Sequence, residues 1–275
     1  KVYYGGINMS RIDLVEVFND TLYKIYSNAK LMEYVINSSN NQEVFLEDDI
    51  LENIGQNRYN VECQIVVSQK KTLEAAMEYK EEVCVLNFAS SYNPGGGVLL
   101  GSNAQEESIC RCSTLYCNLI QNNILEKFYL RHRKEKNNFL NTDDLIYTPN
   151  VVVFKDDSTY EEYKNIWKMI NVISCAAPDL SNASINVSEE QLSYIYKKRI
   201  KRILEVARLK KQKNIILGAF GCGVFSNSPY LVAKSMFEVI REYYYDFKKI
   251  EIAIYDPTSM KINYNTFKEM AKEYC

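Results

Sequence analysis

The sequence has little of what a metal centre or a nucleic-acid-binding surface needs. Its 275 residues include 33 basic and 35 acidic side chains and a single histidine, His132. This near balance of charge argues against an electrostatic grip on nucleic-acid phosphates. Cys110, Cys112 and Cys117 form a C-x-C-x4-C pattern, but no second cysteine or histidine pair completes a structural zinc site. We therefore expect neither a metal ion nor direct nucleic-acid binding.

Long apolar runs are also missing. No run approaches the roughly 18 apolar residues of a membrane-spanning helix, and no signal peptide is recognisable, so we expect no membrane segment in this chain. Most of the eight cysteines lie in apolar runs, such as Cys84 in EVCVLNF and Cys175 in VISCAAP. That setting is typical of reduced, buried thiols. The expected location is a reducing, cytoplasmic compartment; what precedes Lys1 stays open.

Two familiar nucleotide-binding patterns are absent as well. The chain contains neither G-x-G-x-x-G nor G-x-x-x-x-G-K-[ST], which disfavours a dinucleotide oxidoreductase and an NTPase. It does contain two glycine-rich stretches, NPGGG at residues 93–97 and GAFGCGVF at residues 218–225. Each is compatible with a plain turn between a strand and a helix, or with a loop that lets a ligand approach the backbone.

The hydrophobic pattern predicts an α/β protein with a helical extension at the N-terminus. Residues 10–39 carry apolar side chains at helical spacing, from Ile12 to Ile36, after the N-cap residue Ser10. From about residue 61, short apolar strands alternate with amphipathic helices, which favours a largely parallel sheet covered on both faces. We expect an extension at residues 1–55 packed on a core at residues 56–275, with an exposed loop at residues 132–144. The expected strands are residues 61–67, 83–89, 150–154, 169–177, 214–220 and 250–256, and the expected helices after the extension are residues 72–80, 189–211 and 230–245.

Unusual residues follow three of the expected strands. VCVLNFA runs into SSYNPGGG, VISCAA into Pro178-Asp179, and NIILGAF into GCGVFSNSP. Ligands of open α/β sheets bind outside the carboxyl ends of the strands, and backbone N–H groups at a helix N-terminus receive phosphate oxygens. Together these loops suggest a cleft for a ligand that contains a pyrophosphate.

Two charged stretches leave alternatives open. Glu106 and Glu107 can form the first turn of a helix through SICRCSTLYCNLI, where carboxylates favour the positive end of the helix dipole, or they can supply a general acid or base. The run KKRIK at residues 197–201 can be a solvated helix face or a local basic patch.

The glycines and the glutamates share a spacing. Gly95-Gly96-Gly97 is followed, after seven residues, by Gln105-Glu106-Glu107. This arrangement resembles the signature of the poly(ADP-ribose) glycohydrolases, and the NFA, NPGGG, AP and GAFGCGVF segments resemble those of the compact bacterial type. The resemblance covers roughly residues 55–257 together with the helical N-terminal part. It implies a macrodomain, a three-layer α/β/α sandwich with a mixed, largely parallel sheet that binds ADP-ribose.

The resemblance also implies an activity and a set of site residues. The expected reaction is hydrolysis of ribose–ribose O-glycosidic bonds in poly(ADP-ribose), with Glu107 as the catalytic acid and base, Glu106 as the second catalytic residue that holds the ribose hydroxyls, and no cofactor. ADP-ribose, its polymer and ADP-ribosylated proteins are the expected partners. The adenine pocket is expected near Tyr255. The implied substrate-binding residues are Asn87, Gly95, Gly96, Gly97, Gln105, Gly221, Cys222, Gly223, Val224 and Phe225.

Two other functions stay open from the sequence. One is a binding module that senses ADP-ribose or a related nucleotide, although the intact QEE argues against a pure binder. The other is a hydrolase that removes single ADP-ribose units from protein side chains.

Overall fold

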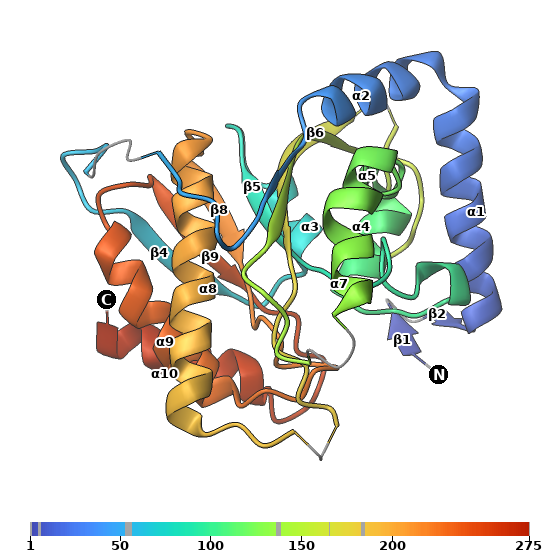
Figure 1. Ribbon diagram of the computed structural model, residues 1–275. Helices are drawn as coiled ribbons and strands as arrows, with labels where there is room; N and C mark the ends of the chain where they lie inside the picture. Colours follow the sequence, from blue (N-terminus) through green and yellow to red (C-terminus); the bar gives the residue numbers. More distant parts are fainter. Residues whose placement is uncertain are drawn as a thin grey trace.

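A mixed β-sheet lies at the centre of the molecule, between two layers of helices (Figure 1). The computed structural model describes residues 2–4, 7–52, 57–135, 139–164, 166–182 and 185–274. Within these residues the sheet has seven strands in the order β3-β6-β7-β5-β8-β9-β4. The strands are β3 (Glu43–Phe45), β4 (Gln64–Ser68), β5 (Cys84–Phe88), β6 (Leu145–Val153), β7 (Lys168–Cys175), β8 (Asn214–Leu217) and β9 (Lys249–Ala253).

Most of the strand pairs are parallel. The neighbours from β7 through β5, β8 and β9 to β4 all run parallel, whereas β6 is antiparallel to both β7 and β3. A separate two-stranded antiparallel sheet joins β1 (Val2–Tyr4) to β2 (Ile7–Met9). The expected α/β sandwich with a mixed, largely parallel sheet is confirmed.

The helices cover both faces of the sheet. On one face lie α8, α9 and α10, and on the other α1, α3, α4, α5 and α7 (Figure 1). The α-helices are α1 (Arg11–Ser27), α2 (Ala29–Asn40), α3 (Thr72–Met77), α4 (Gln105–Cys112), α5 (Leu115–Leu119), α6 (Asn122–Ile124), α7 (Leu130–Lys134), α8 (Glu189–Leu209), α9 (Pro229–Ile240) and α10 (Ile262–Tyr274). Shorter turns are η1 (Val98–Leu100), η2 (Leu125–Tyr129) and η3 (Arg241–Tyr243).

Side chains of the central strand alternate between the two faces. Leu86 of β5 belongs to the core under α8 and α9, whereas Val85 belongs to the core under α4. Because successive strand residues point to opposite faces, Asn87 shares the face of Val85 and points toward α4. This alternation decides which strand-end side chains can reach the glutamates of α4.

The N-terminal prediction needs correction in its details. The expected single helix is two helices, because Asn28 ends α1 and its side chain accepts the N–H groups of Lys30 and Leu31 to cap α2. Ile12 and Ile36 are exposed, and α1 instead buries the stripe that contains Leu14, Phe18 and Ile25. The sequence prediction also omitted β3 and α10.

The loop and domain predictions fare differently. Residues 136–138 of the predicted exposed loop lie outside the described residues, but His132 and Asp144 at its ends are buried, so the prediction is wrong there. The domain boundary at residue 55 also lies outside the described residues and stays a prediction. None of the helices in the described residues combines the length and apolar character that crossing a membrane requires.

The KKRIK run is neither a basic patch nor a fully solvated face. Its three lysines each pair with a carboxylate, and Arg199 at its centre is only 2% exposed. Arg199 donates to the carbonyls of Leu140, Asn141 and Ala176 and pairs with Asp143, so it ties the start of β6 to the end of β7.

Candidate active site

The three unusual strand ends meet at one cavity of about 270 Å³. Ser90 to Asn93 follow β5, Asp179 follows β7 and Phe225 follows β8, and all of them line it. Phe139 and Asn141 complete the lining. The convergence follows from the parallel order of β7, β5 and β8, which brings their carboxyl ends to the same edge.

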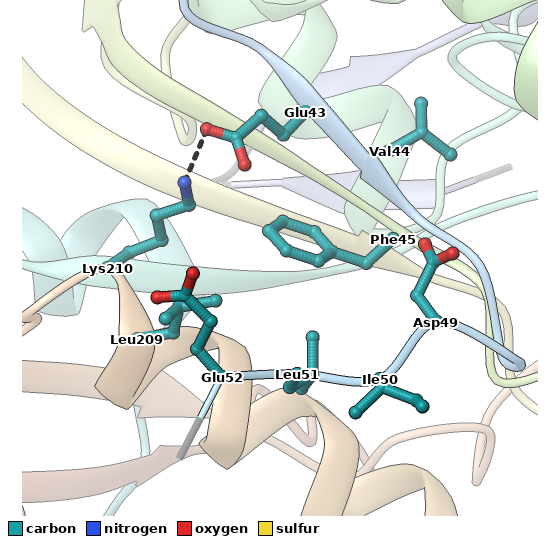
Figure 2. A pocket seen from close by; sticks show the side chains of 9 residues that line it. All are labelled: Glu43, Val44, Phe45, Asp49, Ile50, Leu51, Glu52, Leu209 and Lys210. Atoms are coloured by element: carbon teal, nitrogen blue, oxygen red, sulfur yellow. Dashed lines mark hydrogen bonds and ion pairs between the residues drawn. The ribbon is translucent and has the colours of Figure 1, made fainter. Parts of the chain in front are cut away.

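A larger cavity, of about 500 Å³, lies elsewhere. Figure 2 shows the side chains that line it, with the ion pair between Lys210 and Glu43 as a dashed line. Leu209 and Lys210 come just before β8 starts, so this cavity lies away from the carboxyl ends of the parallel strands. None of the predicted site residues lines it.

Asn87 connects the central strand to the glutamates. Its side chain is fully buried, and its Nδ2 donates to Oε1 of Glu106 at 3.2 Å and to Oγ of Ser174 at 3.0 Å. Its Oδ1 is buried and has no hydrogen-bond partner among the described residues. Asn87 therefore holds the carboxyl of Glu106 with one hydrogen bond, and its own Oδ1 remains available as an acceptor.

Gln105 fixes the start of α4 to the end of β5. Its Oε1 accepts the N–H of Phe88 at 2.8 Å, and its Nε2 donates to the carbonyl of Leu86 at 2.7 Å and to Oγ1 of Thr72 at 3.0 Å. The amide is thus fully occupied by protein atoms. In this conformation Gln105 orients the next two residues, and its amide is already bonded to protein atoms.

Glu106 is a buried carboxyl, 3% exposed. Besides Asn87, its Oε2 accepts the N–H of Ser90 at 2.8 Å, at the point where the chain leaves β5. Burial raises the pKa of Glu106 to about 8, the hydrogen bond from Ser90 opposes this rise, and the neighbouring charge of Glu107 adds to it. A carboxyl group so placed holds its proton around neutral pH.

Glu107 is held by two backbone N–H groups. Its Oε1 accepts from Gly97 at 2.8 Å and its Oε2 from Ala104, the N-cap of α4, at 2.9 Å. Both glutamates lie in the first turn of α4, as one of the two interpretations of the sequence has it, and Glu107 in addition accepts the N–H of the N-cap residue. The same contacts join the start of α4 to the triple-glycine turn (residues 95–97).

The triple-glycine turn leaves no room for side chains. Gly96 has φ +60°, and a Cβ placed on it would lie 2.5 Å from Oε1 of Glu107 and 3.1 Å from Oε2 of Glu106. Gly95 has φ +68°, and its Cβ would meet the ring of Tyr116 at 2.9 Å. The glycines are required because their backbone touches the two carboxyl groups directly.

The C-terminal glycine loop (residues 221–225) has the opposite character. Among the described residues, no hydrogen bond is donated by the N–H groups of Gly221, Gly223 and Val224. A Cβ on Gly223 would meet no atom within 4 Å. The N–H of Cys222, in contrast, donates to the carbonyl of Ala219 at 3.0 Å, so the prediction that it forms part of the phosphate cradle does not fit this conformation.

Some residues of the site were missed by sequence reasoning. Asn141 accepts from Oγ of Ser91 at 2.6 Å and donates to the carbonyl of Ala177 at 2.6 Å, and it lines the cavity. Arg199 supports it from α8. Helical spacing offered a signal for Arg199, because Leu192 and Tyr196 precede it on the same buried face. Nothing in the sequence distinguished Asn141.

The first half of the chain matches a known protein family. The sequence profile described as "Microbial-type PARG, catalytic domain" matches residues 13–156, just over half of the chain. The chain belongs to the microbial-type PARG family. No curated protein sequence matches it. The profile match includes the triple-glycine turn and both glutamates but ends before the C-terminal glycine loop.

Solved structures extend the likeness over the whole fold. The poly(ADP-ribose) glycohydrolase (PARG) from Thermomonospora curvata is 25% identical with a TM-score of 0.86, and the match covers 94% of this chain and 99% of that one. The PARG from Deinococcus radiodurans in complex with ADP-ribose is 29% identical with a TM-score of 0.77, over 88% of this chain and 98% of that one. The likeness in structure therefore covers far more of this PARG-family chain than the residues that the profile matches.

Proposed function

We propose that this chain is a poly(ADP-ribose) glycohydrolase that hydrolyses ribose–ribose O-glycosidic bonds and releases ADP-ribose, with Glu107 as general acid and base. The observation that carries the proposal is the contact between the glycine turn and the glutamates, since Oε1 of Glu107 accepts from Gly97 at 2.8 Å. A ligand that lies against the turn therefore lies against the carboxyl groups. Family membership supports the same activity.

The reaction needs a proton for the leaving ribose oxygen. Glu107 supplies it as the bond to the anomeric carbon breaks, an oxocarbenium-like charge develops on the distal ribose, and the same residue then takes a proton from the attacking water. Burial raises the pKa of the neighbouring Glu106 to about 8, so the carboxyl next to Glu107 holds its proton near neutral pH.

Glu106 and Asn87 are proposed to hold the substrate ribose. The unused, buried Oδ1 of Asn87 offers an acceptor next to Glu106. Glu106 and Glu107 are neighbours on one helix, so they cannot flank the scissile bond on opposite faces. Because consecutive residues of a helix point in different directions, the two side chains also cannot have the same role. One glutamate therefore serves binding and the other turnover, in contrast to the two-carboxylate scheme of most glycosidases.

The C-terminal glycine loop is proposed to bind the pyrophosphate. The unpaired N–H groups of Gly221, Gly223 and Val224 are suitable donors to phosphate oxygens. Phe225 lines the cavity, and we infer that it presses on the terminal ribose. The solved Deinococcus relative in complex with ADP-ribose supports this ligand class.

The remaining partner and location assignments stay predictions. We infer that the substrates are the polymer and ADP-ribosylated proteins, that adenine binds near the half-exposed Tyr255, and that the enzyme acts in a reducing, cytoplasmic compartment. We also infer that the backbone of the triple-glycine turn shapes the ribose subsite, and that the side chain of Gln105 does so indirectly by fixing the start of α4 to the end of β5.

Hydrolysis of labelled polymer by the wild-type chain and by Glu107→Gln tests the proposal. We expect the variant to lose roughly 10²–10⁴-fold in kcat, the range that general acid–base groups contribute, while its affinity for ADP-ribose stays within a few-fold. Glu106→Gln serves as the matched variant, and we expect it to lower the affinity for ADP-ribose in addition to any loss of kcat.

Two other outcomes have distinct meanings. If the wild-type chain binds ADP-ribose with micromolar affinity but leaves polymer intact, the glycohydrolase proposal is wrong and the chain is a binding module. If it cleaves singly modified protein but not polymer, the substrate class is wrong.

A further inference from the structure

The fully buried Arg111 lies one helical turn after Glu107 on α4. We propose that Arg111 is a positioning residue for the hydrolysis: it fixes the loop that holds Glu107 and anchors this loop to helix α1. The proposal rests on the proposed function, because it assigns Glu107 the catalytic role.

The contacts of Arg111 converge on the loop between the glycines and the glutamates. Its Nη2 donates to the carbonyl of Ser102, and its Nη1 donates to Oδ1 of Asn103 at 3.3 Å. The next residue, Ala104, supplies the N–H that holds Oε2 of Glu107. The guanidinium therefore fixes the backbone immediately before one of the two donors to Glu107.

The same loop also carries the second donor. The carbonyl of Gly97 accepts the N–H groups of Leu100 at 2.9 Å and Ser102 at 3.1 Å, so the residue that Arg111 holds is bonded back to Gly97. Gly97 in turn donates to Oε1 of Glu107. Loop, glutamate and arginine thus form a closed set of contacts, in which loosening Ser102 loosens both donors.

Helix α1 forms the outer wall of this arrangement. Nε of Arg111 donates to the carbonyl of Leu14 at 3.2 Å, and Oγ1 of Thr21 donates to the carbonyl of Arg111 at 2.5 Å. A Cβ on Gly101, whose φ is +71°, would lie 2.2 Å from the carbonyl oxygen of Arg11. The N-terminal helix therefore packs directly on the loop, and Arg111 links its backbone to the catalytic helix.

A guanidinium is suited to this task and an ammonium is not. The planar fork of Arg111 reaches three separate neutral oxygens at once, whereas a lysine is a compact point donor on a flexible stem. Arg111→Lys keeps the charge but cannot keep all three contacts. Small misplacements of catalytic groups can cost about 10²-fold in rate.

The chain offers a matched control in Arg202. This arginine is 9% exposed and also donates to backbone carbonyls, those of Leu46 and Asp49, but it contacts neither glycine loop. Replacing it by lysine removes similar hydrogen bonds far from the glutamates. Its effect on kcat gives the baseline for a change that is only structural.

The experiment compares Arg111→Lys and Arg202→Lys with the wild type. For each, kcat and KM on polymer are measured and normalised to the folded fraction from circular dichroism, and the Kd for ADP-ribose is measured by calorimetry. We expect kcat to fall about 10- to 100-fold for Arg111→Lys, with Kd within about threefold, and to change less than about twofold for Arg202→Lys.

Asn103→Ala covers the case in which Arg111→Lys does not fold. It leaves the guanidinium in place and removes one half-buried acceptor, and we expect kcat to fall about three- to tenfold. The proposal is overturned if kcat per folded molecule of Arg111→Lys matches that of Arg202→Lys, or if Asn103→Ala keeps the wild-type kcat. A wild-type chain that binds ADP-ribose but cleaves no polymer would contradict the proposed function instead, a failure visible without any variant.

Discussion

The two glycine loops of the site differ in how much of their bonding capacity is already used. At the triple-glycine turn, Gly97 donates to Glu107, and the space next to Gly96 is filled by both carboxyl groups. At the C-terminal glycine loop, several N–H groups have no acceptor among the described residues, and the space next to Gly223 is open. One loop is closed around protein groups and the other is open to a ligand.

The difference fits the two tasks that we propose for these loops. Groups that act on a developing charge work best when the fold has fixed them beforehand. Groups that bind an anion must keep their donors available until the ligand arrives. Substitutions in the closed loop should therefore affect turnover first, and substitutions in the open loop should affect binding first.

The largest expected effect is that of Gly96→Val. A Cβ at this position would lie 2.5 Å from Oε1 of Glu107, and a φ of +60° is a strained conformation for a β-branched residue. We expect hydrolysis to fall at least about 10³-fold, because both carboxyl groups must shift. Polymer cleavage assays measure this, with Cys222→Ala, for which we expect a change in kcat of less than about twofold, as the control. A Gly96→Val enzyme that retains a tenth of the wild-type kcat would show that the closed loop is adaptable.

The second prediction concerns pH and Glu106. Its pKa is raised in the folded chain from an ordinary value of 4.5 to about 8, chiefly by burial, so the folded state binds the proton more tightly than the unfolded state. The contribution to stability is therefore fully present below about pH 4.5 and is lost as pH rises to about 8. Urea unfolding at pH 4.5, 6 and 8 should show this loss, of roughly 3–5 kcal/mol, in the wild type relative to Glu106→Gln.

Glu251 provides the matched contrast for that measurement. It is also buried, but hydrogen bonds from Lys249, Ser68 and Tyr79 outweigh the effect of burial and lower its pKa. Its contribution is present at neutral pH and lost as pH falls, so Glu251→Gln should change the profile with the opposite sign. If the free energy of unfolding depends on pH in the same way for the wild type and for Glu106→Gln, the prediction that Glu106 is a buried carboxyl with a raised pKa is wrong.

The third prediction separates two glycines of the open loop. Gly221 has φ +80°, and a Cβ on it would lie 2.5 Å from the hydroxyl of Tyr196, so Gly221→Ala should destabilise the fold by about 1–3 kcal/mol. Gly223→Ala should leave stability unchanged or raise it by up to about 1 kcal/mol, yet weaken ADP-ribose binding. Thermal unfolding and calorimetry on both variants measure these effects. Equal effects of both variants on stability would remove the distinction between them.

The closed loop was more accessible to sequence reasoning than its surroundings. Its glycines and glutamates are local in sequence, and their spacing carries the family signature. The meeting of three strand ends was also predictable, since it follows from strand alternation and parallel topology. Apolar periodicity predicted the fold class, six of the seven strands of the main sheet, and helices α3, α8 and α9.

What was not predicted depends on contacts between distant residues. Asn28 ends α1 and caps α2, and the apolar periodicity of residues 10–39 does not indicate this break. Asn141 enters the site because Arg199, 58 residues later, holds its backbone. The hydrogen bond from Gly97 to Glu107 depends on where α4 begins. The N-cap residue of this helix, Ala104, has no side-chain acceptor, and Glu107 accepts the N–H of Ala104 as well. Such roles belong to the three-dimensional arrangement and leave no local pattern.

The smallest expected effect tests whether the open loop acts through its backbone. Burial raises the pKa of the Cys222 thiol to about 12, so it stays protonated and is no nucleophile at neutral pH. The N–H of Cys222 donates to Ala219, a contact that alanine keeps. We expect Cys222→Ala to change kcat and the Kd for ADP-ribose less than about twofold, because it alters none of the open donors. A tenfold loss of binding would mean that the side chain, and not only the backbone, contacts the ligand. The two loops would then differ less than their hydrogen bonds indicate.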